Sequence, residues 1–156
     1  MEPQRIETLP AKRLVGMSVK MSLSNNRTAE LWRGFMPRRQ SVSNRIGNHY
    51  LSLQKYREPG PPKPDTVFEK WAAVEVSDFD TVPSGMEPYE MEGGEYAVFV
   101  HRGPASTFPQ TMSAVFQEWL PGSGFQVDSR EHFELLEDGY SPIDPMATEE
   151  VWIPIR

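Results

Sequence analysis

Hydrophobic and polar residues follow one another along this chain with two different periods. Short runs rich in apolar and β-branched residues are typical of strands. Six such runs occur, three in each half of the chain: residues 12–23, 49–56 and 66–76, then 95–103, 125–138 and 149–155. Each half also contains one stretch with the 3.6-residue period of a helix, placed between its first and second strand-like run.

The two helical stretches are bounded by residues that begin or break helices. The first begins near Asn26 and carries Leu31, Trp32 and Phe35 before Pro37 stops it. The second spans about 106–120. Its apolar face consists of Phe108, Met112, Val115, Phe116, Trp119 and Leu120. Pro121 and Gly122 follow, and we expect the helix to end there.

Both halves therefore have the order β-α-β-β, which indicates an internal duplication with pseudo-repeats at about 8–77 and 86–156. Breaker-rich segments at 58–64 and 79–85 lie between strand-like runs. We predict an α+β fold in a single domain, 1–156. Tandem β-α-β-β repeats would form one curved antiparallel sheet with two main helices and a cleft where the units meet.

Composition narrows the class of protein. The chain has no Cys, and its N-terminus has no apolar segment typical of a secretory signal. No apolar run approaches the length of a membrane span, so we expect a cytoplasmic protein without membrane contact. We also expect no metal site, because the spacing of the three His residues matches no ligand motif, and no cofactor, because no phosphate-binding glycine loop is present.

The net charge of −6 is unevenly distributed along the chain. Residues 1–63 carry 12 Lys/Arg against 4 Asp/Glu, whereas residues 64–156 carry 4 against 18. A basic half can indicate nucleic-acid binding. The basic residues are scattered and no DNA-binding motif accompanies them, so we favour mutual attraction of the two halves and expect no direct nucleic-acid partner.

Glu134 is the residue whose chemistry the pattern leaves open. Strand alternation puts Phe133 and Leu135 on one face and Glu134 with Leu136 on the other. Glu134 is then either a solvated residue of an exposed face or a carboxylate held in a pocket. A carboxylate removed from water without a partner is costly, so in a pocket it takes up a proton or binds a cation.

Several short stretches, in this order, resemble the GyrI-like small-molecule-binding domain, which is also the effector-binding domain of some AraC-type and MerR-type transcription regulators. In the first half the stretches are LPAKRLVGMS at 9–18, SNN at 24–26, LWRGF at 31–35 and WAAVEV at 71–76. In the second half they are GGEYAVFVHRG at 93–103, FQEWLP at 116–121, HFELL at 132–136 and EEVWIPI at 149–155. Together they extend over most of the chain.

The resemblance implies a pocket between the repeats, lined by aromatic side chains around a buried glutamate. That glutamate falls on Glu134, and Leu136 replaces the aromatic residue that follows it in the family's strand motif. Trp119, Tyr96 and Trp71 are the aromatic residues that we rank first as pocket liners. Trp32 and Phe99 are further candidate ligand-binding residues.

The resemblance therefore implies a stand-alone domain that binds amphipathic, cationic or aromatic small molecules in sensing or sequestration. Two alternatives remain open. One is an enzyme that hydrolyses reactive genotoxic molecules, with Glu134 as its catalytic residue; enzymatic activity is the less favoured interpretation because no second catalytic group is clearly placed. The other is a module that acts by binding a protein partner, as a gyrase inhibitor does. The partner is then another protein or a second copy of this chain in a homodimer.

Overall fold

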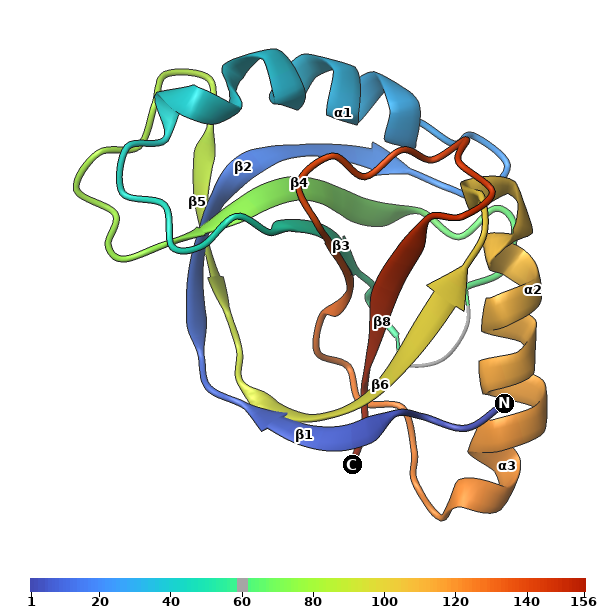
Figure 1. Ribbon diagram of the computed structural model, residues 1–156. Helices are drawn as coiled ribbons and strands as arrows, with labels where there is room; N and C mark the ends of the chain where they lie inside the picture. Colours follow the sequence, from blue (N-terminus) through green and yellow to red (C-terminus); the bar gives the residue numbers. More distant parts are fainter. Residues whose placement is uncertain (59–61) are drawn as a thin grey trace.

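The computed structural model describes residues 1–58 and 62–156 and contains one eight-stranded antiparallel sheet (Figure 1). The strands of the first half are β1 (Arg5–Leu9), β2 (Lys12–Met21), β3 (Tyr50–Lys55) and β4 (Phe68–Val76). Those of the second half are β5 (Glu87–Met91), β6 (Gly94–Arg102), β7 (His132–Leu136) and β8 (Thr148–Pro154). The predicted α+β class with one antiparallel sheet is confirmed.

The strand order β1-β6-β8-β7-β3-β4-β2-β5 is symmetric about its centre. Exchanging each strand of the first half with its counterpart in the second half, β1 with β5 through β4 with β8, gives the same order reversed. The two halves meet in the middle, where β3 pairs with β7. They also meet at both edges, where β1 pairs with β6 and β5 pairs with β2. Each half thus completes the sheet of the other.

Strands β1 and β5 were not predicted from the sequence. Each continues after a short bend into the next strand, β1 into β2 and β5 into β6, and this makes the sheet curl on itself (Figure 1). The Gly93–Gly94 pair, which looks like a simple turn, forms the second bend. Gly94 has φ of +147°, and a Cβ atom there would lie 2.5 Å from the guanidinium of Arg130. A side chain at position 94 would therefore displace Arg130 from the bend.

The helical segments lie outside the curl of the sheet (Figure 1). Helix α1 (Thr28–Phe35) is followed directly by the 3-10 helix η1 (Met36–Ser41). The second segment consists of η2 (Ala105–Thr107), α2 (Phe108–Ser113), the π-helical η3 (Ala114–Trp119) and α3 (Leu120–Ser123).

One of the two predicted helix ends was wrong. Helix α1 ends at Phe35, before Pro37, as predicted, and Pro37 stands at the start of the 3-10 helix η1, where its missing N–H is not needed. Pro121 likewise stands at the start of α3, so the second segment continues to Ser123 and ends at Gly124, which has φ of +80°.

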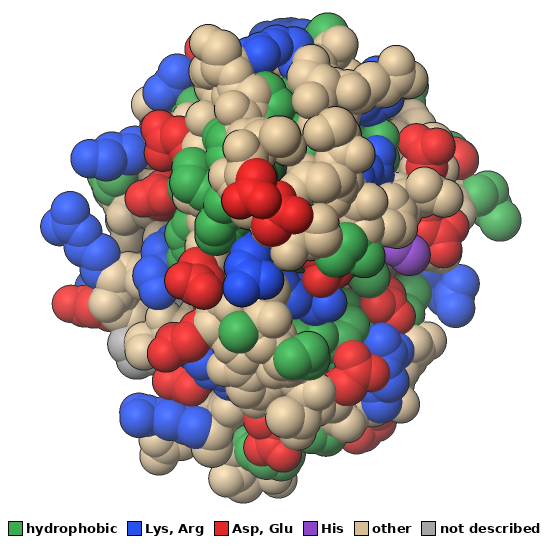
Figure 2. All heavy atoms as spheres, turned by 90° about the vertical axis from the view of Figure 1, so that its left-hand side faces the viewer, with side chains coloured by type: hydrophobic (Ala, Val, Ile, Leu, Met, Phe, Trp, Pro, Cys, Tyr) green, Lys and Arg blue, Asp and Glu red, His purple; other side chains and the backbone are tan. Residues whose placement is uncertain are grey.

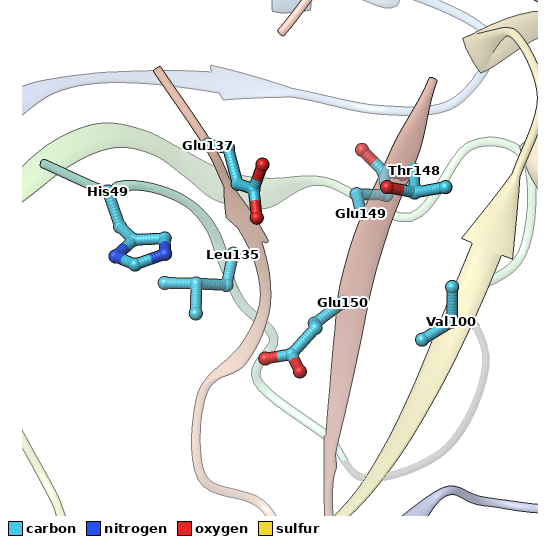
Figure 3. A pocket seen from close by; sticks show the side chains of 7 residues that line it. All are labelled: His49, Val100, Leu135, Glu137, Thr148, Glu149 and Glu150. Atoms are coloured by element: carbon cyan, nitrogen blue, oxygen red, sulfur yellow. The ribbon is translucent and has the colours of Figure 1, made fainter. Parts of the chain in front are cut away.

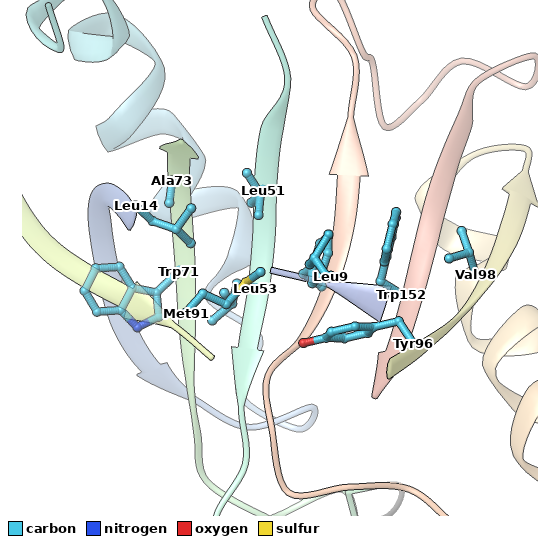
Figure 4. Packing of buried hydrophobic residues seen from close by; sticks show 11 residues of the cluster. Leu9, Leu14, Leu51, Leu53, Trp71, Ala73, Met91, Tyr96, Val98 and Trp152 are labelled. Carbon is cyan, nitrogen blue, oxygen red and sulfur yellow. The ribbon is translucent and has the colours of Figure 1, made fainter. Parts of the chain in front are cut away.

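The inner face of the curled sheet is an apolar core to which both halves contribute. Its cluster contains Leu9, Leu14, Leu51, Leu53, Trp71, Ala73, Met91, Tyr96, Val98, Phe133 and Trp152 (Figure 4). The rings of Phe133 and Trp152 stack at 5.2 Å, and the ring of Tyr96 meets both edge-on. Phe133 thus faces the core, as predicted.

The outer face carries the helices over two smaller apolar clusters. Helix α1 packs through Leu31 and Phe35 on the cluster that includes Tyr50 and Leu136. The second helical segment packs through Val115 on the cluster that includes Phe99 and Val151. The face of β7 opposite Phe133 is therefore covered, and a solvent-exposed Glu134 is excluded.

The strand predicted over 125–138 is shorter than expected, because β7 spans only His132–Leu136. Phe125 and Val127 pack instead with the second helical segment. Of the breaker-rich stretch 58–64, residues 59–61 lie outside the described part of the chain.

The charges of the two parts of the sequence are interleaved on the molecule. Arg5, Lys12 and Lys55 come from the basic part, and they pair with Glu150, Glu75 and Glu131 of the acidic part. Figure 2 shows Lys and Arg side chains mixed with Asp and Glu over one whole face. Among the described residues, no helix is long and apolar enough to cross a membrane.

Candidate functional site

Glu134 lies on β7, at the central seam of the sheet where the two halves pair. It stands opposite Ser52 of β3 and Val151 of β8. Because alternation puts Phe133 in the inner core, the Glu134 side chain points to the outer face, which carries the two helical segments. Only 8% of the residue is exposed, so the carboxylate is buried between the clusters under the helices.

Two polar side chains of the first half contact the Glu134 carboxylate. Gln54 Nε2 donates a hydrogen bond to Glu134 Oε1 over 2.9 Å. Lys70 Nζ lies 3.5 Å from the same oxygen, and Lys70 is itself only 6% exposed. Gln54 pairs with Lys70 in the sheet register, so both side chains emerge on the outer face beside Glu134. The buried charge has a buried counter-ion, as burial requires.

A second glutamate, Glu149 of β8, is buried on the same face. Burial raises the pKa of its carboxyl to about 7, and the negative charge of Glu134 adds to the shift, while a hydrogen bond from Tyr140 and the charge of Lys70 oppose it. The carboxyl of Glu149 therefore keeps its proton until the pH approaches neutral, and ionises there. We call Lys70, Gln54, Ser52, Glu134 and Glu149, which lie across β4, β3, β7 and β8, the polar row.

Aromatic rings flank the polar row at its Gln54 end. Tyr56 meets the ring of His132 edge-on at 4.9 Å, and Phe116 of η3 stacks on His132 at 6.5 Å. Burial lowers the pKa of His132 to about 3, with a further contribution from the charge of Arg130, so its imidazole is neutral. Burial raises the pKa of the Tyr56 hydroxyl, and the nearby charge of Glu134 raises it further.

A cavity of about 160 Å³ lies at the Glu149 end of the polar row. It is lined by His49, Val100, Leu135, Glu137, Thr148, Glu149 and Glu150, which come from β6, β7, β8 and the segments beside them (Figure 3). The pairing of β7 with β8 ends at Leu135 and Glu150, so the strands separate beyond this point. We call this space the β7–β8 cavity.

A larger cavity of about 410 Å³ lies at the other end of the row, near the ends of β3 and β4. Its lining includes Tyr56 and Phe68, whose rings are 4.9 Å apart, and the basic side chains Lys20, Lys55 and Arg57. We call it the strand-end cavity. Glu134 itself lines neither cavity, whereas Tyr56 lines the strand-end cavity and Glu149 lines the β7–β8 cavity.

Five of the seven predicted ligand-binding residues lie on the outer face. They are Glu134, Leu136, Phe99, Trp32 and Trp119. Trp32 of α1 meets the ring of Tyr50 edge-on at 6.2 Å, and Trp119 of η3 meets Phe99 at 5.2 Å. These two tryptophans approach the outer face from different helical segments, one on each side of the polar row.

The structure does not bring Trp71 and Tyr96 together with Glu134. Both belong to the inner core, where Trp71 packs against Tyr89 at 5.0 Å and Tyr96 packs against Phe133 and Trp152. The Tyr96 hydroxyl donates to the backbone carbonyl of Glu131 over 2.8 Å. Strand alternation separates them from Glu134, and only knowledge of the strand register could have shown this.

Four residues of the polar row were missed: Gln54, Ser52, Lys70 and Glu149. Each sits in a strand-like run or directly after one, and a polar residue there is most simply read as solvent-facing. Lys70 carried one usable signal, because it interrupts the apolar run 66–76 at a position whose i+2 and i+4 neighbours are Ala72 and Val74. Within residues 1–58 and 62–156, no group of three or more His, Asp or Glu side chains is arranged to hold a metal ion.

The arrangement can accept positive charge. With both glutamates ionised, the polar row carries two negative charges and the single positive charge of Lys70. Aromatic rings lie at its border, and ring faces attract cations as well as apolar groups.

Comparison with known proteins identifies relatives of this architecture. The sequence profile described as "GyrI-like small molecule binding domain" matches residues 2–156. The transcriptional regulator BrlR of Pseudomonas aeruginosa is 26% identical over 155 residues, which are 97% of this chain and 54% of BrlR. The chain thus spans about half the length of that relative.

Solved structures share the fold. SAV2435 bound to tetraphenylphosphonium superposes with a TM-score of 0.70 at 22% identity, covering 100% of this chain and 94% of the other. The C-terminal domain of EcmrR superposes with a TM-score of 0.70 at 14% identity, covering 100% of this chain and 99% of the other. At these identities the likeness establishes the fold alone.

Proposed function

Because this chain belongs to the GyrI-like family of small-molecule-binding domains, we propose that it binds an amphipathic small molecule that carries positive charge beside an aromatic surface. The observation that carries the proposal is the buried carboxylate of Glu134, placed at the seam of the two halves between the helical segments. The binding would act in sensing or sequestration, by analogy with BrlR as a transcriptional regulator.

The electrostatics of the polar row support a cationic ligand. Glu134 and Glu149 are both more than nine-tenths buried, and Lys70 supplies one compensating charge for the two. A buried excess of negative charge is costly, and a ligand cation removes that cost. SAV2435 was solved with tetraphenylphosphonium, an aromatic cation of the class that the charge balance favours here.

The strand-end cavity provides space for the apolar part of such a ligand. Its volume of about 410 Å³ lies within the ordinary range of small-molecule sites. Tyr56 lines this cavity and is also close enough for Glu134 to raise the pKa of its hydroxyl. We therefore place the apolar part of the ligand against the Tyr56 and Phe68 rings of the strand-end cavity. Its positive group is directed to Glu134, away from the basic side chains of that cavity.

The test is calorimetric titration with two probes of similar shape, the cation tetraphenylphosphonium and the neutral triphenylphosphine oxide. Glu134→Gln keeps the shape of the side chain and removes its charge. We expect this variant to bind the cation about tenfold more weakly, because the phosphonium has no N–H or O–H and is attracted to the carboxylate through charge alone. Affinity for the neutral probe should stay within about twofold.

The matched control is Glu118→Gln, which removes an exposed glutamate of η3 and makes the net charge less negative by the same amount. It should leave both affinities unchanged. Equal losses for both probes in Glu134→Gln would mean that Glu134 acts only through packing. Absence of binding by either probe to the unmodified protein would contradict the proposed ligand class.

Hydrolysis is a second candidate function, and Glu149 is the observation that favours it. A carboxyl with a pKa of about 7 near the Glu134 carboxylate can exchange a proton at neutral pH, which suits general acid–base catalysis. Chromatography of a reactive electrophile, such as an aryl epoxide, incubated with the protein would show turnover. The activity should be lost in Glu149→Gln and in Glu134→Gln.

A further inference from the structure

Lys70 is the buried cation of the candidate site. It comes from the middle of the sheet, where β4 pairs with β3 on one side and with β2 on the other, and it lies opposite Gln54 and Val19. Within the described part of the chain, Lys70 Nζ is the one Lys or Arg nitrogen found within 4.0 Å of the Glu134 carboxylate.

Its contact is made to an oxygen that is already occupied. Both Lys70 Nζ and Gln54 Nε2 approach Glu134 Oε1, at 3.5 Å and 2.9 Å. The ammonium group is therefore held by charge at a distance longer than that of a tight ion pair. A lysine stem has four rotatable carbons, so a group held in this way can move while its backbone stays in the sheet.

We propose that Lys70 is the specificity-determining residue of this site: it is a resident cation that a ligand's positive group must share with, or displace from, Glu134. The inference rests on the proposed function, because it assumes that ligands bind at Glu134. Lys70 then sets a threshold, so that weakly held cations are excluded and only those with enough aromatic or apolar contact bind. Neutral ligands do not compete with it.

The charge balance of the polar row also indicates that Lys70 competes with a ligand's positive group. Lys70 neutralises one of the two buried glutamates, so the site has capacity for one further positive charge when Glu149 is ionised. Without Lys70 the capacity doubles, and the Glu134 carboxylate has only the amide of Gln54 as a partner. A cationic ligand would then become the sole counter-ion of Glu134.

The experiment compares tetraphenylphosphonium and triphenylphosphine oxide on the full chain with Lys70→Met and Lys70→Arg. We expect Lys70→Met to bind the cation at least tenfold more tightly than the unmodified protein does. Lys70→Arg keeps the charge and should remain within about threefold. Neither variant should change the affinity for the neutral probe by more than about twofold.

Two further variants separate charge from packing and from folding. Lys12→Met breaks another lysine–glutamate pair, formed with Glu75 on the opposite face of β4, and should change neither affinity. The double variant Lys70→Met with Glu134→Gln removes both charges and is expected to fold even if Lys70→Met alone is unstable. The double variant should show no gain in affinity for the cation, because it lacks the Glu134 carboxylate that the removal of Lys70 would free for the ligand.

The outcomes distinguish this inference from the proposed function. Cation binding that is unchanged or weaker in Lys70→Met, or an equal gain for both probes, would overturn the role of Lys70 and leave the proposed ligand class standing. Cation binding to Lys70→Met but not to the unmodified protein, with the neutral probe bound by both, would support the threshold in its strongest form. If no variant binds either probe, both the proposed function and the role of Lys70 are contradicted.

Discussion

At the scale of the residue, Glu149 couples the stability of the fold to pH. Its pKa in the folded protein is about 7, above the usual value of a glutamate in an unfolded chain. Between these two values the folded protein holds a proton that the unfolded chain has lost. Stability must therefore fall as pH rises from about 4.5 to about 7, and the loss is complete above that range.

Glu149→Gln tests this coupling, because the amide cannot ionise. Relative to the unmodified protein, its free energy of unfolding should rise by roughly 2–3 kcal/mol as the pH is raised from 4.5 to 8, at about 1.4 kcal/mol for each unit of pKa shift. Urea unfolding at a series of pH values measures the difference. The charged and titratable groups that face Glu149 are Glu134, Lys70 and Tyr140. His101 also lies opposite Glu149, on β6.

The control for this series is Glu118→Gln, which makes the same change at an exposed glutamate outside the polar row. A pH dependence that both variants share is not specific to Glu149. A flat difference for Glu149→Gln would show that the carboxyl of Glu149 ionises in the folded state as readily as in the unfolded chain.

The sequence revealed the face on which Glu134 lies but not its surroundings. Alternation along a single strand separates Glu134 from Phe133, and that separation is correct. Lys70 and Glu149 reach the same site through the pairing of β4 with β3 and of β7 with β8. Those registers depend on long-range contacts, so no local pattern at 70 or 149 could identify the partners of Glu134.

At the scale of the element, the curl of the sheet depends on the bends that join β1 to β2 and β5 to β6. The predicted strands that form the interior of the sheet were found, because each contains apolar residues in a short run. Strands β3 and β4 are the clearest cases, since they are buried at nearly every position. Strands β1 and β5 lie at the sheet edges, and each is buried only at its last residue, Leu9 or Met91. Neither contains a run of apolar residues, so their sequences resemble those of loops. What fixes them is a set of contacts from elsewhere in the chain.

Arg130 supplies such contacts at the second bend. Its side chain pairs with Asp128 over 2.8 Å, donates to the carbonyl oxygens of Glu95 and Ile155 over 2.6 and 3.1 Å, and lies 4.7 Å above the ring of Tyr96. Arg130→Met should lower the free energy of unfolding by roughly 2–4 kcal/mol, because buried carbonyls and a carboxylate lose their donor. Chemical denaturation measures the loss.

Arg102→Met provides the comparison, since Arg102 is exposed on β6 and its removal should change stability by less than about 0.5 kcal/mol. Similar values for the two variants would mean that the bend is held by its glycines and the strand pairing alone.

At the scale of the whole molecule, the two halves are interdependent although their sequences look like separate repeats. Three of the strand pairings join one half to the other: β1 with β6, β2 with β5, and β3 with β7. The repeat order was readable from the sequence because each half keeps its own helix and strands. The exchange of edge strands was not readable, because it is a property of the assembled sheet. The candidate site exists only in the assembled sheet as well, since Lys70 and Gln54 come from one half and Glu134 and Glu149 from the other.

The interdependence predicts the behaviour of the chain divided at its turn, into residues 1–82 and 83–156. Each fragment loses the partners of three strands, so neither should unfold cooperatively alone, whereas an equimolar mixture should regain the circular dichroism of the intact sheet. Fragment 1–82 has 13 Lys/Arg against 9 Asp/Glu, and fragment 83–156 has 3 against 13, so they attract each other. Their association should therefore weaken as salt is raised from 20 to 500 mM, in a range where exposed charges become screened. Cooperative unfolding of either fragment by itself would show that the repeats are independent, and a reconstitution insensitive to salt would show that apolar burial alone brings the halves together.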